Sequence, residues 1–317
     1  MDFNLVETRD ENEWNTLVAS SPQGNIFSDT RYLNALNNKY TCYLLKAKHG
    51  ETLAGVVIIE NGSSMHEAPF PYTPYNGILF SKLVSSLQNH KRVTTEFRIT
   101  EFLINILHKR YGNFSMALHL DFDDIRPFLW YNYNESNGQK FIIKTRYTAV
   151  INLENFNLEE YLKNIRAVRR QEYRKTAAEI SQTKNTTLFL EIYAKTFARQ
   201  GIIISSERLE LVNRIVTTVL ENNIGILSMA STKHGIASMA LFIYDSHNAY
   251  YLFGANNPEL RNTGASTALM INNICAIADM GISNLDLVGV NSPNRGDYKM
   301  SFNSVLKPYY EVKLGCL

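Results

Sequence analysis

The chain has 317 residues, which is enough for two domains that each bury a core. Its hydrophobic fraction of 45% and charged fraction of 20% are typical of a soluble globular protein, and no apolar run approaches the roughly 18 residues of a membrane span. A net charge of +2 argues against general binding to DNA, and three well-separated cysteines argue against a disulfide framework or a CxxC metal site.

The first part of the chain predicts two helices and then a hairpin. Residues 11–36 carry two helical patterns separated by a Ser-Pro turn, and residues 40–46 and 52–60 alternate as two strands around a Gly-containing turn. The acidic, polar N-terminus is not a secretory signal. Together with the cysteine usage, this predicts a cytoplasmic protein.

Residues 65–80, MHEAPFPYTPYNGILF, have the most unusual local composition. Their three prolines exclude a helix and a central strand. A stiff, amphipathic loop of this kind suits the wall of a ligand site. A loop that only covers its own domain is an equally good interpretation.

Residues 82–111 predict a helix, residues 115–120 a short strand and residues 128–133 an aromatic strand. His119 and Asp121 share a strand face, but one His and one Asp do not make a metal site, so no metal is expected. The Asn-Gly pair at 137–138 is a strong turn signal, and we place a domain boundary after residue 140.

The second half opens with a predicted strand at 145–153 and a long, basic helix at 158–183. On one helix, Arg166, Arg170 and Arg174 would share a face, and a solvated basic face is the simplest interpretation. A helix and an antiparallel meander follow, with the helix at 208–220 and the strands at 224–230, 235–244 and 249–253.

Residues 249–303 carry the strongest functional signal. An apolar strand, a turn of small residues, a helical pattern and a second apolar run at 285–288 predict a βαβ unit. Gly264 and Ala265 would let a ligand approach the first amides of the helix, and these amides together with the helix dipole favour a phosphate. In the alternative interpretation, Ser266 or Thr263 only caps the helix.

Several of these segments resemble one family. Arg261-x-x-Gly264-x-Ser266 resembles the Q/R-x-x-G-x-G/A pyrophosphate loop of GNAT-type N-acyltransferases, with Ser in the last position. Residues 167–175, AVRRQEYRK, resemble the Arg-Arg-x-Ile-Arg-Lys signature of the FemAB-like and BioF2-like members. Their C-terminal pattern is also present, although Asn303 stands where Gly is usual, in the segments Ala278-x-x-Gly281, Asp286-x-x-Gly289 and Tyr298-Lys299-x-Ser301-Phe302.

The resemblance implies an α+β protein of tandem GNAT-like (acyl-CoA N-acyltransferase) domains. Each would contain a mixed, mostly antiparallel sheet flanked by helices. The N-terminal GNAT-like domain would span residues 1–140. The C-terminal GNAT-like domain, residues 141–317, would carry the donor-binding turn.

The resemblance also implies transfer of an acetyl or aminoacyl group to an amine of a cell-envelope or polysaccharide precursor. No permanently bound cofactor is expected, because the donor is a co-substrate: acyl-CoA, or aminoacyl-tRNA as in the FemAB branch. The small net charge favours acyl-CoA. A peripheral membrane contact stays open. A non-catalytic module that binds a nucleotide sugar or a peptide is the alternative from another class.

Acyl transfer to an amine requires no protein nucleophile, and none is evident. By resemblance, Lys299 binds a phosphate or stabilises negative charge, although it is equally readily a surface lysine. Asp286 accepts the amine proton or orients its neighbours. The acceptor is assigned to Tyr72, Tyr75 and Asn76, and the donor to Arg169, Arg170, Arg261, Asn262, Thr263, Gly264, Ala265 and Ser266.

Overall fold

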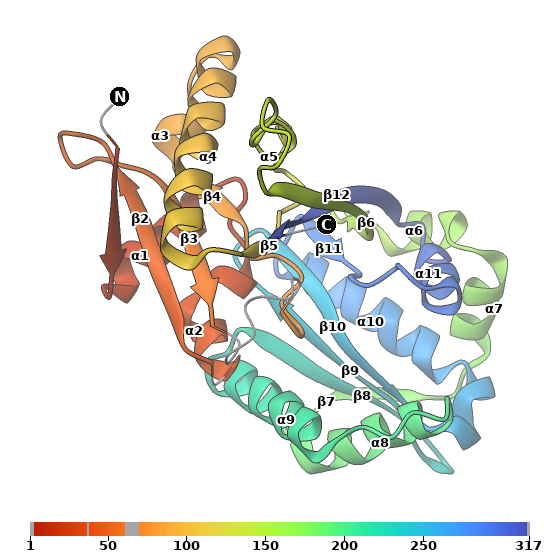
Figure 1. The fold of residues 1–317 in the computed structure, drawn as a ribbon. Helices are drawn as coiled ribbons and strands as arrows, with labels where there is room; N and C mark the ends of the chain where they lie inside the picture. Colours follow the sequence, from red (N-terminus) through yellow and green to blue (C-terminus); the bar gives the residue numbers. More distant parts are fainter. Residues whose placement is uncertain (1–2, 37, 61–69, 316–317) are drawn as a thin grey trace. The chain divides into compact units, whose positions relative to one another are not determined.

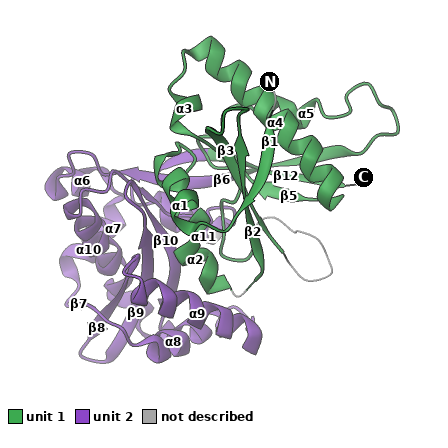
Figure 2. Ribbon diagram, turned by 90° about the vertical axis from the view of Figure 1, so that its left-hand side faces the viewer, with its two compact units in different colours: residues 1–146, 308–317 green, residues 147–307 purple. Residues whose placement is uncertain are grey.

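A computed structural model describes residues 3–36, 38–60 and 70–315. The chain divides into two compact units: unit 1 comprises residues 1–146 and 308–317, and unit 2 comprises residues 147–307 (Figure 2). The boundary predicted after residue 140 lies at the start of strand β6 (Lys140–Asn152), whose first part still belongs to unit 1. Strand β12 (Val305–Gly315) likewise returns the last ten residues to unit 1. A turn signal marks where a strand starts, but it does not indicate which core that strand joins.

Unit 1 contains an antiparallel sheet in the order β1-β2-β3-β4 (Asn4–Thr8, Tyr40–Lys46, Thr52–Ile59 and Ile78–Phe80). The predicted hairpin is β2–β3. Helix α4 (Asn89–Tyr111) packs on this sheet, because Ile99, Leu103 and Leu107 recur on one helical face and join a buried cluster with Val56. Strand β5 (Ser115–Ala117) pairs with β12.

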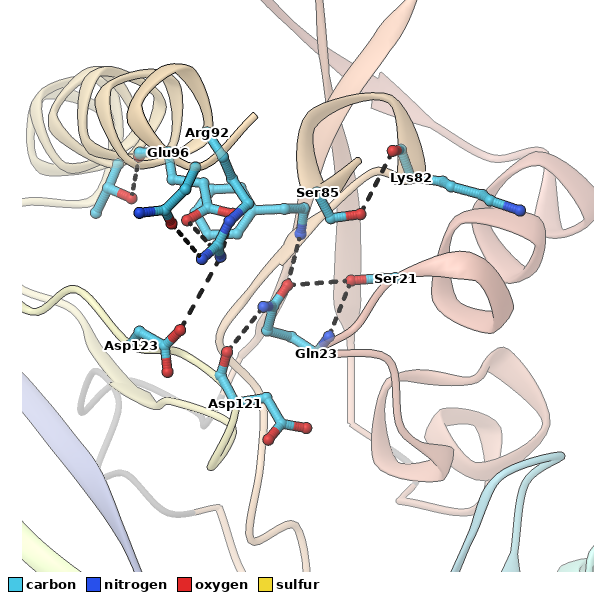
Figure 3. Close-up of polar contacts among 11 residues, drawn as sticks. Ser21, Gln23, Lys82, Ser85, Arg92, Glu96, Asp121 and Asp123 are labelled. Atoms are coloured by element: carbon cyan, nitrogen blue, oxygen red, sulfur yellow. Dashed lines mark hydrogen bonds and ion pairs between the residues drawn. The ribbon is translucent and has the colours of Figure 1, made fainter. Parts of the chain in front are cut away.

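Helix α1 (Glu11–Ser20) is fixed to this core through a buried glutamine. Gln23 Nε2 donates to the carbonyl of Asp121 at 2.9 Å, and its Oε1 accepts from the amide of Phe80 at 3.1 Å and from the hydroxyl of Ser21 at 3.3 Å (Figure 3). A buried amide must satisfy both its ends. The Ser-Pro turn is therefore tied to β4 and to the segment after β5.

Three predicted elements of unit 1 differ in the structure. The second helix of residues 11–36 is broken into short turns, η1 (Ile26–Ser28), α2 (Thr30–Leu33) and η2 (Asn34–Leu36). The helix at 82–111 is interrupted, since α3 (Lys82–Ser85) precedes α4. The aromatic strand at 128–133 is wrong: Pro127 starts the short helix α5 (Arg126–Leu129), as proline at a first helical turn does, and Asn132 has a positive φ of 52°. Residues 65–69 of the aromatic loop lie outside the described residues.

Unit 2 contains the strand order β6-β11-β10-β9-β8-β7. The predicted meander is β8 (Gly225–Thr232), β9 (Gly235–Tyr244) and β10 (Asn248–Asn256), and the predicted βαβ unit continues through helix α10 (Ala265–Asp279) to the parallel strand β11 (Asn284–Asp286). The other pairings are antiparallel, including that of β7 (Glu179–Gln182) with β8. The protein is thus α+β, with mixed, mostly antiparallel sheets.

Helices cover the unit 2 sheet, and strands β8–β10 lie between α10 and the pair α8 (Thr186–Ala198) and α9 (Ser206–Glu221) (Figure 1). Ile271 and Ile274 of α10 are buried with Phe242 of β9. On α8, the rings of Phe189 and Tyr193 lie 6.3 and 5.7 Å from that of Phe253. No helix within the described ranges is both long and apolar enough to cross a membrane.

The single long helix predicted at 158–183 is wrong. It is divided into α6 (Leu158–Asn164) and α7 (Ala167–Lys175), and the chain then enters β7. Ile165 interrupts the helix. Its backbone is extended, and this conformation lets its side chain be buried in the core. Arg166 therefore precedes α7, and the predicted single face of three arginines does not form.

Candidate functional site

The two parallel strands of unit 2 separate part-way along their length. β10 pairs with β11 over three positions that end with Tyr250 opposite Asp286. β10 then continues to Asn256, with an irregularity in its pairing with β9 between Tyr251 and Phe253. Beyond Tyr250, no described residue of β11 pairs with β10. Except at Asn256, whose amide and carbonyl both bond to the Thr196 hydroxyl, a strand edge of this kind can bond to a ligand.

Gly264 forms the turn that opens α10 beside these strands. Its φ of +74° is left-handed, a conformation that glycine adopts without strain. A Cβ at this position would lie 2.9 Å from the backbone carbonyl oxygen of Glu172 in α7. The packing of α7 on the turn therefore requires glycine here, whatever ligand binds.

The first turn of α10 retains an open amide. The amide of Thr267 donates to the carbonyl of Gly264 at 3.1 Å, and that of Ala265 lies 3.4 Å from the Thr263 hydroxyl. Within the described chain, the amide of Ser266 has no hydrogen-bond acceptor. An open amide at the positive end of a helix dipole favours an anion.

Arg169 lies next to this turn, with its guanidinium already engaged. It donates to the Glu172 carboxylate at 2.7 Å and to the Ser301 hydroxyl at 2.9 Å, and it lies 4.7 Å from the centroid of the Tyr298 ring. The hydroxyl of Thr267 donates to the same carboxylate at 2.6 Å. Arg169 thus joins α7 to the start of α10 and to α11 (Pro293–Met300).

Strand β11 ends in a strained turn held by Asp286. Val288 has a φ of +50°, which is rare for a β-branched residue and typical of functional turns. The buried carboxylate of Asp286 accepts the amide of Val288 at 2.7 Å and also the hydroxyl of Thr148. Asp286 therefore bonds to this turn and to β6, and its two predicted roles stay predictions.

Lys299 of α11 holds the same turn from its other side. Its Nζ donates to the carbonyls of Leu287 and Val288, both at 2.6 Å, and lies 5.2 Å from the centroid of the Tyr251 ring. An ammonium has three donors, and the third has no partner among the residues that the structure describes. It remains available to a bound molecule.

The surroundings of Lys299 lower the pKa of its ammonium. Burial lowers its pKa to about 8, the negative charge of Asp286 raises it, and the positive charge of Arg295 lowers it further. At neutral pH the group is mainly an ammonium that is close to losing its proton. This places a titratable cation where β10 and β11 separate.

Two tyrosines complete the cluster that Lys299, Asp286, Arg169 and the first turn of α10 form. Burial raises the pKa of Tyr298 to about 12, and burial also raises the pKa of Tyr251 well above its usual range, so both hydroxyls stay protonated. The hydroxyl of Tyr298 donates to the carbonyl of Ser266 at 3.4 Å. The hydroxyl of Tyr251 lies against Gly254, where a Cβ would meet it at 2.0 Å.

The structure thus brings together Lys299, Asp286, Arg169, Gly264, Ala265 and Ser266. Arg261 and Asn262 lie exposed in η3 (Pro258–Thr263), before the turn. Arg170 is turned away, since it donates to the carbonyls of Leu162 and Lys163 at the end of α6, both at 3.1 Å.

The residues assigned to the acceptor lie in unit 1. Tyr75 is 1% exposed, with its ring 5.0 Å from that of His119, and the side chain of Asn76 accepts the amide of Ala117 at 2.8 Å. Tyr72 is half-buried with a positive φ of 63°. The side chains of Tyr75 and Asn76 therefore take part in the packing of unit 1.

Sequence reasoning did not assign the side chains of Tyr251, Tyr298 or Thr148 to the site. Tyr298 stands directly before Lys299 in the sequence, and this position could have indicated that it belongs to the site. Thr148 looked like one position of an alternating strand, and only the pairing of β6 with β11 brings it to Asp286. No metal-binding group of three His, Cys, Asp or Glu side chains occurs within residues 3–36, 38–60 and 70–315.

Comparisons with known proteins agree with this architecture. Residues 159–300 match the family described as "Acetyltransferase (GNAT) domain", and this segment contains every residue of the cluster except Thr148 and Ser301. No curated protein sequence matches the chain significantly.

Solved structures match over the full length at low identity. The crystal structure of FemX is 12% identical with a TM-score of 0.69, and the match covers 98% of this chain and 97% of FemX. A conserved protein of unknown function from Bacteroides thetaiotaomicron is 11% identical with a TM-score of 0.61, covering 98% and 100%. A tandem GNAT protein from the clavulanic acid biosynthesis pathway is 8% identical with a TM-score of 0.57, covering 99% and 98%. Residues 159–300 therefore match the GNAT acetyltransferase domain family, and the chain over its full length has the fold of FemX and of the tandem GNAT protein.

Proposed function

We propose that this acyltransferase uses acyl-CoA as its donor and an amine of a cell-envelope or polysaccharide precursor as its acceptor. The observation that carries the proposal is that the open first turn of α10 follows β10, the strand that separates from β11 where Lys299 lies. The Ser266 amide would hold the diphosphate of CoA. The edge of β10 would bond to the amides of the extended pantetheine arm.

The chemistry follows from that placement. The neutral acceptor amine attacks the thioester carbonyl, a C–N bond forms, and the carbonyl oxygen becomes an oxyanion. The C–S bond then breaks, the thiolate leaves and takes up a proton, and the amine nitrogen loses one. We assign the stabilisation of this negative charge to the third N–H of Lys299, whose ammonium lies 5.2 Å from the centroid of the Tyr251 ring, and to the neutral hydroxyl of Tyr251. Asp286 keeps the Val288 turn in position.

The state of the basic helix favours CoA over aminoacyl-tRNA. An RNA donor needs several free cations along its backbone. Arg166 forms two 2.8 Å contacts with Asp297, and Arg169 and Arg170 are engaged as described. The sequence resemblance to the FemAB branch keeps aminoacyl-tRNA as the second candidate donor.

The acceptor and the compartment belong to the same proposal. We assign acceptor binding to the loop that carries Tyr72, whose side chain is half-buried. The buried residues Tyr75 and Asn76 would hold this loop in place. The unpaired thiols of Cys42 and Cys275 support a reducing compartment, as in the cytoplasm. Cys316 lies outside the described residues.

Calorimetric titration of the full chain with acetyl-CoA, free CoA, a UDP-linked amino sugar and a charged tRNA tests the donor. Acetyl-CoA and CoA should bind with similar affinity, because the diphosphate and the pantetheine arm carry the contacts. Thiol release from acetyl-CoA should then depend on an added amine. Binding of charged tRNA without binding of CoA would overturn the acyl-CoA donor. Binding of CoA with no amine-dependent thiol release from any acyl-CoA would overturn the transfer reaction.

A further inference from the structure

Unit 1 contains a second candidate binding site, far along the chain from the cluster of unit 2. It is a cavity of about 340 Å³ between the β2–β3 turn, the start of β1, and helices α3 and α4. Its walls are apolar, formed by Phe3, Leu53, Leu83, Val84 and Leu87. This volume lies at the lower end of the roughly 300–1,000 Å³ of small-molecule sites.

The mouth of this cavity leaves large apolar side chains in water. Leu83 is 55% exposed and Leu87 is 36% exposed. Both lie in the short segment between β4 and α4, on either side of the buried Val84. Exposed leucines around an apolar cavity favour a ligand that covers them.

The charges at this cavity are positive. Lys48 and the polar side chain of His49 line it, no Asp or Glu of the described residues does, and the Lys48 ammonium forms no ion pair with any of them. Residues 82–111 add six Lys or Arg against two Glu, a net charge of +4 in a chain whose total is +2. Of these cations, Arg92 lies within 4.0 Å of Glu96 and Asp123 (Figure 3).

We propose that this cavity binds the apolar chain of an anionic amphiphile, with the negative head at Lys48 and His49. An apolar chain would fill the space lined by Leu53 and Val84 and would cover Leu83 and Leu87. A negatively charged head matches the unpaired ammonium of Lys48 at the tip of the hairpin, and the His49 ring beside it can form a hydrogen bond with the head. The site does not depend on the proposed transfer reaction, because all its lining residues belong to unit 1.

Calorimetric titration of the full chain with alkanoates and alkanols tests this directly. From octanoate to decanoate, each methylene should tighten binding about fourfold, as expected for burial of one CH₂. Decanol should bind more weakly than decanoate, because its head is neutral. Chain-length-independent affinity, or equal affinity for decanol and decanoate, would overturn the proposal.

Variants with matched controls locate the site. Leu83→Asp and Leu87→Asp put a carboxylate at the mouth and should weaken decanoate binding at least tenfold. Leu129→Asp is the control, since Leu129 lies on α5 with 54% exposure and is not part of the cavity. Wild-type affinity in Leu83→Asp and Leu87→Asp would place the ligand elsewhere.

A second Lys-His-Gly turn in the chain serves as the control for binding of the ligand's negative head. Lys233-His234-Gly235 repeats the Lys48-His49-Gly50 sequence at the tip of the β8–β9 hairpin. Lys48→Gln combined with His49→Gln should weaken decanoate binding several-fold and leave decanol binding unchanged. The same pair of changes at Lys233 and His234 should alter neither. A loss of decanol binding equal to that of decanoate would contradict the assignment of the head.

Two sources could provide this chemistry, a free amphiphile or a lipid held in a membrane, and sedimentation with vesicles separates them. If phosphatidylglycerol vesicles retain the chain, phosphatidylcholine vesicles do not, and Leu83→Asp releases it, the source is the membrane lipid. If decanoate binds and neither vesicle retains the chain, the source is a free amphiphile. If the chain binds neither decanoate nor anionic vesicles, the proposal is wrong.

Discussion

The two units contain the same hairpin but connect it to their long helices differently. Both hairpins turn at a Lys-His-Gly sequence, with Gly50 at a φ of 96° and Gly235 at 116°, and both have a register irregularity in the strand before the tip. In unit 2 the third strand, β10, leads to Gly264 and directly into α10. In unit 1 the third strand, β4, leads through α3 to α4, without a glycine.

This difference indicates which part of each unit would bind a ligand. The two hairpins share the same turn sequence and irregularity, whereas the connection from the third strand to the long helix differs in kind. The unit 2 connection presents an open amide at a helix start, which suits an anion. The unit 1 connection presents Leu83 and Leu87, which suit an apolar chain. Matched substitutions in the two units test that assignment.

Placing a carboxylate at each helix start should separate the units most clearly. Ser266→Asp should lower acetyl-CoA affinity by about a hundredfold or more, because like charges in contact cost several kcal/mol. An acidic residue in a first turn also interacts favourably with the helix dipole, so the fold should be retained. Asn89→Asp makes the matched change at the start of α4 and should leave affinity unchanged in the same titration. An equal loss in both variants would show that unit 2 has no special role.

Removing one lysine from each unit tests the second contrast. Lys299→Ala should reduce transfer by roughly ten- to a hundredfold, since a charge-assisted hydrogen bond is typically worth about 1.5–3 kcal/mol. Lys313→Ala removes an exposed lysine of unit 1 and should have no effect. Wild-type activity should fall with ionic strength, less steeply so in Lys299→Ala. Full activity of Lys299→Ala at low and high salt would return that residue to a structural role.

A third experiment separates the close approach at Gly264 from its backbone conformation. Gly264 and Gly281 have φ values of 74° and 78°, but a Cβ would meet Glu172 only at Gly264, while nothing lies within 4 Å at Gly281. Gly264→Ala should therefore lower the free energy of unfolding by about 1–3 kcal/mol more than Gly281→Ala, as overpacking does. Chemical denaturation measures the difference. Equal losses would show that α7 moves away at no cost, and Gly264→Val could then serve as a test of the ligand alone.

Much of the fold followed from local patterns. The Gly-containing turns and alternating strands of both hairpins, and the βαβ unit around α10, depend on near neighbours in sequence and were predicted correctly. The helix at 158–183 was wrong because helical composition continues through Ile165, where burial against the core of unit 2 decides the backbone conformation. The strand predicted at 128–133 was wrong because the prediction followed its aromatic residues, which favour a strand, and not Pro127, which favours the start of a helix.

The site was predictable only where a motif was contiguous. Gly264 to Ser266 and Lys299 came from short patterns, and their assignment to the donor and to charge stabilisation stays a prediction. The engagement of Arg169 by Ser301 and the distance of Arg170 from the cluster depend on contacts more than 100 residues apart or on the break before α7. Sequence spacing carries no information about such contacts.

The smallest expected effect concerns the pH dependence of donor binding. The folded pKa of Lys299, about 8, lies below its ordinary value, because burial disfavours the charged form. If its ammonium contacts the donor, acetyl-CoA affinity is fully present below pH 8 and is lost as the pH rises through that value. Between pH 7 and 9 the affinity should fall by roughly five- to tenfold as the protonated fraction declines.

Lys299→Arg provides the control, because a guanidinium stays charged throughout this range. Its affinity for acetyl-CoA at pH 7 should be lower than that of wild type, because the longer, planar group fits less well at the carbonyls of Leu287 and Val288, but it should not change between pH 7 and 9. Any titration of CoA itself would appear equally in both proteins, so the difference between the two profiles belongs to Lys299. A profile that falls equally in wild type and Lys299→Arg would assign the titration to another group, and a wild-type profile that rises with pH would indicate that the neutral amine of Lys299 is the form that acts.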